Sequence, residues 1–280
     1  MSFIASYEDG EPELKSAEFL ARIADVLGPD YRQHEDRCFH WLTPLSQPEH
    51  EQVARQAHYA VSRLPEVLPG LDPRPTAEAW PVVLLADLDD QLAYHDLFPD
   101  SGETIIDGGC WRLWPVGHLA IPVGSQREFD GVFAHELVHA MLDPDGVPGW
   151  IQEGFACEAE TRLGLRPSPF HDRDDLEATL HFWRHHSLDA FWSAEAFRQP
   201  ESSPHAYRLA QIITTRWAND RSAIAAIRKV GAEGWEDQEA VLFHQFGLER
   251  AGIFAAISVR PRRMGWIERM LYGMFVGEKR

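Results

Sequence analysis

The chain has 280 residues, and its apolar and charged fractions of 44% and 25% are ordinary for a globular protein with a real hydrophobic core. Its formal net charge of −18 argues against nucleic acid or anionic membrane as a partner, because both need clustered basic residues. No apolar run approaches the ~18–20 residues of a membrane span, and residues 1–15 lack a secretory-signal pattern, so we expect a cytoplasmic protein. The three cysteines fit a reducing compartment.

The first part of the chain has helical patterns. Residues 11–27 carry apolar side chains at three- and four-residue steps, which predicts an amphipathic helix. Residues 48–68 predict a second helix, and the Pro- and Gly-rich stretch 68–75 ends it. We therefore expect residues 1–75 to form an N-terminal helical flank.

Strand patterns follow. The apolar, β-branched run at residues 81–88 predicts a buried strand, and residues 89–98 predict a helix. After the break at Gly108 and Gly109, residues 110–123 predict one or two strands.

Two helices with clear start and stop signals come next. A capping box at residues 125–128 opens a helix over 127–142. Pro148 precedes a second helix over 149–163, which stops near a glycine. From about residue 174 to the C-terminus the sequence predicts several helices broken by Pro and Gly.

The first of these helices carries the sequence HELVH, which is an HExxH motif. Helix positions i and i+4 lie one above the other, so His135 and His139 can reach one ion. Glu136 lies beside them on the same turn, within reach of a proton on a water at the metal. A histidine-rich chain can contain HExxH by accident, but an accidental motif would rarely lie in a capped amphipathic helix.

A tetrahedral zinc site needs a third protein ligand and keeps its last position open for catalysis. Thirteen residues separate His139 from Glu153, enough to end one helix and begin the next. Glu158 and Glu160 on the same predicted helix are rival ligands.

The blocks AHELVHAML and PGWIQEGFACE together resemble the HExxH plus W-x-x-E-G-x-A pair of the gluzincin zinc peptidases, specifically the peptidase MA-like family. The resemblance implies a zincin-like fold over roughly residues 78–250. It also implies that Glu153 is the glutamate ligand, in preference to Glu158 and Glu160.

Hydrolysis also needs a donor aimed at the developing oxyanion. The family has a tyrosine at the start of a later helix that faces the zinc, and Tyr207, after the stretch SSPH, matches it by resemblance. His205 is the substitute candidate.

One departure concerns the strand before HExxH, where aminopeptidase relatives carry G-x-M-E-N. The matching region here has no acidic residue after Asp107, which favours an endopeptidase. A substrate strand could add to the edge of this segment by backbone pairing.

Other candidate groups have simpler interpretations. Cys157 is expected to be a buried structural thiol, with soft metal ligation as the alternative. His181 and His185 have i, i+4 spacing but no adjacent glutamate, which predicts a solvated face. An acidic cluster lacks the EF-hand glycine and terminal glutamate, so we expect a strand-to-helix turn there. The cluster consists of Asp87, Asp89 and Asp90.

These patterns predict an α+β protein, and the resemblance implies that it is zincin-like, with a helical flank at 1–75, a zincin core at 76–165 and a helical subdomain at 166–280. The predicted activity is zinc-dependent hydrolysis of a peptide or protein substrate, with Glu136 as general base. Rival interpretations are a zincin-fold binding or regulatory protein without turnover, and a zinc hydrolase of other substrates. The sequence does not determine the oligomeric state.

Overall fold

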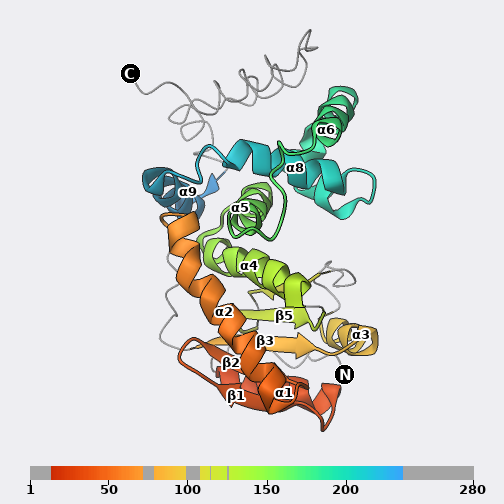
Figure 1. Ribbon diagram of the computed structural model, residues 1–280, viewed down its shortest axis with the longest axis vertical. Helices are drawn as coiled ribbons and strands as arrows, with labels where there is room; N and C mark the ends of the chain where they lie inside the picture. The colour runs from red at the N-terminus through yellow and green to blue at the C-terminus, as the bar shows by residue number, and fades with distance from the viewer. Residues whose placement is uncertain (1–13, 72–78, 99–107, 114, 125, 236–280) are drawn as a thin grey trace. The chain divides into compact units, whose positions relative to one another are not determined.

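The computed structural model describes residues 14–71, 79–98, 108–113, 115–124 and 126–235 (Figure 1). The chain is α+β, with a small mixed five-strand sheet and a mainly helical remainder. It divides into two compact units. Unit 1 comprises Met1–Leu64 and Pro73–Ala140, and unit 2 comprises Pro65–Asp72 and Met141–Arg280. The predicted boundaries after residues 75 and 165 stay a prediction.

The sheet of unit 1 has the strand order β1-β2-β3-β5-β4 (Figure 1). The two inner pairs, β2 with β3 and β3 with β5, are parallel, and the two outer pairs are antiparallel. Within the described residues, β4 pairs only with β5, so it is an edge strand. The strands are β1 (Arg32–Glu35), β2 (Phe39–Thr43), β3 (Trp80–Leu85), β4 (Cys110–Arg112) and β5 (His118–Pro122).

Strands β1 and β2 lie in the segment that the sequence predicts as a helical flank. Helices α1 (Ser16–Leu27) and α2 (Gln47–Val67) do form there, close to the predicted ranges, but the flank is not helical throughout. Strand β1 has the sequence RQHE and is largely exposed, so it carries no apolar alternation for a strand prediction to detect. Its partner β2 is only five residues long.

The predictions around the rest of the sheet are confirmed. Strand β3 and helix α3 (Leu88–Asp96) form where the sequence predicts them. Residues 110–123 form two strands, with Pro115 in the connection between them. The predicted capping box depends on Ser125, which lies outside the described residues; helix α4 spans Gln126–Leu142.

Helices cover both faces of the sheet. Helices α1 and α3 pack on one face, where Phe19 and Tyr94 join Leu42 in the core. On the other face, Phe133 of α4 packs edge-on against Phe39, with ring centroids 5.4 Å apart. Side chains alternate along a strand, so Phe39 and Leu42, three residues apart in β2, face opposite sides of the sheet.

Unit 2 is built around a pair of packed helices, α5 and α8. A Cβ atom on Gly154 of α5 would lie 2.6 Å from the Ala210 carbonyl oxygen and 2.6 Å from Thr214, so only glycine allows this approach. Helix α6 packs on α8, where Arg208 bonds Asp175 at 2.6 Å. The helices described from residue 143 onward are η2 (Asp143–Asp145), α5 (Gly149–Arg162), α6 (Arg173–His185), α7 (Asp189–Trp192), η3 (Glu195–Arg198), α8 (Ser203–Thr214) and α9 (Arg221–Glu233).

No helix in the described part of the chain combines the length and the apolar character that crossing a membrane requires.

Candidate metal centre

Helix α4 presents the two histidines of HELVH on one side. The rings of His135 and His139 lie with centroids 5.0 Å apart and planes tilted by 52°. Both are partly exposed, whereas Leu137 and Val138 of the same motif are fully buried. The apolar positions of the motif are therefore buried, while both imidazoles stay partly accessible.

Glu136 is only 7% exposed and lies against the chain that leads into the edge strand β4. A Cβ atom on Gly109 would lie 2.9 Å from Cγ of Glu136 and 2.6 Å from Val132. The backbone can pass this close to α4 only because Gly109 has no side chain. Sequence reasoning treated Gly108 and Gly109 merely as a break; a glycine directly before a short strand was the available signal.

On α5, the W-x-x-E-G-x-A segment has a physical explanation within unit 2. Trp150 is 1% exposed, and its ring lies 5.1 Å from Trp192 and 5.7 Å from Phe191. Gly154 allows the close approach of α8. Glu153, between these two anchors, is partly exposed.

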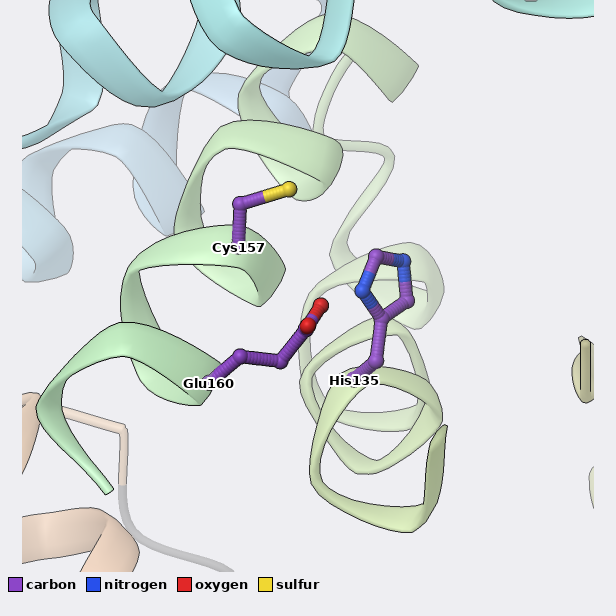
Figure 2. A group of neighbouring side chains, drawn as sticks. All are labelled: His135, Cys157 and Glu160. Carbon is purple, nitrogen blue, oxygen red and sulfur yellow. The ribbon is translucent and has the colours of Figure 1, made fainter. Parts of the chain in front are cut away.

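Two groups of described residues could hold a metal ion. His135, His139 and Glu153 form the first group, and their ligand atoms all lie within 4.8 Å of one another. His135, Cys157 and Glu160, drawn in Figure 2, form the second group by the same criterion. The predicted ligands are thus among the residues brought together, and so is the rival Glu160.

The other rival, Glu158, belongs to neither group. Its side chain is 6% exposed and accepts a hydrogen bond of 2.7 Å from Nε of Arg162. Arg162 also donates to the carbonyl oxygens of Val67 and Ala218, at 2.7 and 3.1 Å. Glu158 therefore anchors the end of α5.

Cys157 is fully buried, as predicted, and its sulfur accepts a hydrogen bond of 3.2 Å from Nη1 of Arg166. The same Nη1 lies 3.7 Å from Oε1 of Glu160. Burial lowers the pKa of Arg166, but nearby acidic groups outweigh burial and raise the pKa overall, so the guanidinium stays charged. In decreasing order of influence these groups are Cys157, Glu160, Tyr207 and Glu153. Sequence reasoning missed Arg166, because no spacing rule connects it with HExxH.

The two candidate oxyanion donors lie in different surroundings on α8. Tyr207 is partly exposed, packs edge-on against Phe197 with centroids 5.1 Å apart, and acts on the pKa of Arg166 together with Glu153. His205 stacks on Phe182 of α6 at 4.5 Å and has Nδ1 3.2 Å from the Thr179 hydroxyl. Burial lowers the pKa of His205. The contacts of His205 belong to the packing of α6 on α8.

The remaining polar clusters have the simpler structures that the sequence predicts. His181 and His185 are exposed, with ring centroids 4.5 Å apart. Asp87 caps α3 by accepting a hydrogen bond of 3.0 Å from the backbone N–H of Asp90. Asp90 in turn accepts a bond of 2.7 Å from the Tyr31 hydroxyl.

A scan of family models finds no match to this chain, and comparisons with curated proteins and with solved structures find no match either.

Proposed function

We propose that this chain is a zinc-dependent peptidase of the gluzincin, MA-like type, with a zincin-like fold and endopeptidase activity. The observation that carries the proposal is the proximity of three ligand atoms, from His135, His139 and Glu153, within 4.8 Å of one another. Glu136, the neighbour of the first histidine, lies next to the edge strand.

The donor set suits zinc. Two imidazole nitrogens and one carboxylate oxygen are ligands that zinc prefers, and three protein ligands leave a position for water or substrate. When bound, zinc supplies Lewis acidity and activates water as a nucleophile at neutral pH. His135, His139 and Glu153 would hold the ion.

Glu136 would act as general base and then as general acid. Its carboxylate would accept a proton from the attacking water and then donate it to the leaving amine nitrogen. Glu136 is 7% exposed, so its carboxylate is largely shielded from bulk solvent. Tyr207 would donate a hydrogen bond to the oxygen that becomes charged in the transition state.

The edge strand β4 offers a way to bind an extended peptide. Its partner on one side is β5, and a substrate strand on the other side would gain backbone hydrogen bonds. Gly109 places the start of this strand against Glu136, which would bring the scissile bond to the base. The described residues 108–113 and 115–123 contain no acidic side chain to capture a free amine, which favours cleavage within a chain.

A peptide-cleavage experiment tests the proposal. The zinc-loaded protein is incubated with a diverse peptide library, and products are identified by mass spectrometry. We expect internal cleavage by the wild type and, in Glu136→Gln, retained zinc with turnover reduced roughly 10²–10⁴-fold, the usual contribution of a general base. Zinc binding without any cleavage would instead indicate a binding protein or a hydrolase of other substrates. Full activity of Glu136→Gln would contradict the mechanism.

A further inference from the structure

This inference rests on the proposed zinc site and concerns how the metal is directed to one of two donor sets. Both sets contain His135, and they differ in His139 with Glu153 against Cys157 with Glu160. Thiolate sulfur is a favourable zinc ligand, so donor chemistry alone does not disfavour the second set. Another feature of the structure must therefore decide which of the two sets binds the metal ion.

The end of α5 places a cation on the second set. Gly164 has φ +77°, and the chain turns back so that the backbone N–H groups of Leu165 and Arg166 both donate to the Glu160 carbonyl oxygen, at 2.9 and 3.3 Å. This turn brings the Arg166 side chain back beside Glu160 and Cys157 of the helix. Its Nη1 lies 3.2 Å from Sγ of Cys157 and 3.7 Å from the Glu160 carboxylate.

The guanidinium opposes metal binding at the second set in two ways. It engages the lone pairs of sulfur and carboxylate that a metal would need, and its charge repels a second cation at the same atoms. Because Nη1 contacts both Cys157 and Glu160, the repulsion acts directly on the set drawn in Figure 2.

We propose that Arg166 is a positioning residue that keeps Cys157 and Glu160 out of the metal's coordination and so directs the ion to His135, His139 and Glu153. Neutralising Arg166 would release the thiol, which would lose its proton to solvent and bind the metal as thiolate.

The absorption spectrum of bound cobalt(II) shows directly whether Cys157 is a ligand. A thiolate ligand gives a charge-transfer absorption band in the near ultraviolet that nitrogen and oxygen ligands do not give. The full-length wild type, loaded with one Co²⁺, should lack the band. Arg166→Met has similar length and no charge, and it should show the band, which Arg166→Met/Cys157→Ser should lose. Arg166→Lys keeps the charge and should give the wild-type spectrum. Arg173→Met, at an exposed arginine paired with Glu177, is the matched control and should also show no band.

Metal affinity gives a second readout. Cys157→Ser should change the Co²⁺ dissociation constant less than about threefold in the wild type, but by about tenfold or more in the Arg166→Met background. A charge-transfer band in the wild type, or its absence in cobalt-loaded Arg166→Met, overturns the inference. If Arg166→Met does not fold, Arg166→Gln is measured by the same criteria. Failure of the wild type to bind Co²⁺ or Zn²⁺ would instead refute the proposed function.

Discussion

The backbone of Gly109 touches the side chain of Glu136: a Cβ atom on this glycine would lie 2.9 Å from Glu136 Cγ. The proposed general base thus packs closely against the chain segment that enters the edge strand. Any side chain at residue 109 has to displace one of them.

Gly109→Ala should therefore damage both stability and activity. The added methyl would also lie 2.6 Å from Val132 Cγ1, and overpacking of this kind costs about 1–3 kcal/mol of unfolding free energy. Displacement of Glu136 should lower kcat on a cleaved peptide roughly 10²-fold. Gly108→Ala is the matched control, because a Cβ there meets nothing within 4 Å. Equal kcat values for the two variants would show that Glu136 is not held by this contact.

How far the sequence predicts this structure depends on the kind of signal. The periodic helices and the apolar strand β3 form within the predicted ranges or begin about one residue before them, because amphipathic spacing and β-branched runs are local. Strand β1 is not predicted, because its residues are polar and it is held by pairing with β2. Gly164 marks the end of α5, yet the contact of Arg166 with Cys157 depends on a turn whose side-chain direction no motif encodes.

The candidate site shows the same contrast. HExxH spacing on a helix is sufficient to bring His135 and His139 together, since the geometry is that of one helical turn. The third ligand depends on tertiary structure, and for this reason Glu153 and Glu160 both remain grouped with a histidine.

Removing only the hydroxyl of Tyr207 tests its role in catalysis. Tyr207→Phe keeps the ring that packs on Phe197, so folding should be preserved. We expect kcat to fall roughly 10²–10³-fold, the usual cost of losing one oxyanion donor. KM should change little, because the hydrogen bond strengthens only as charge develops. An unchanged kcat with a lower melting temperature would make Tyr207 a packing residue, and His205→Ala would then be measured.

A buried histidine predicts a pH dependence of stability. His118 donates from Nδ1 to the Val116 carbonyl oxygen at 2.7 Å and accepts from the Tyr94 hydroxyl at Nε2. Burial lowers its pKa from 6.5 to about 3. The unfolded chain therefore binds a proton in this interval and the folded chain does not, so stability is complete above pH 6.5 and is lost as the pH falls toward 3.

Denaturant unfolding at pH 7 and pH 5 checks this. The wild type should lose about 2 kcal/mol more between these pH values than His118→Gln, which cannot titrate. The difference between the two proteins isolates the contribution of His118 to the pH dependence of stability, because the carboxylates contribute to both proteins. The same pH dependence in both proteins would show that folding does not lower the pKa of His118.

The zinc content of the purified, tag-free protein, measured by elemental analysis, tests the central claim most directly. We predict about one zinc per chain, as expected for one set of three protein ligands. His135→Ala and Glu153→Ala should lose the metal, and Glu160→Ala should retain it. The double variant His181→Ala/His185→Ala removes a histidine pair of the same helical spacing that belongs to neither ligand group, and it should keep its zinc. A wild-type protein that contains no zinc and takes up none on titration would contradict the account.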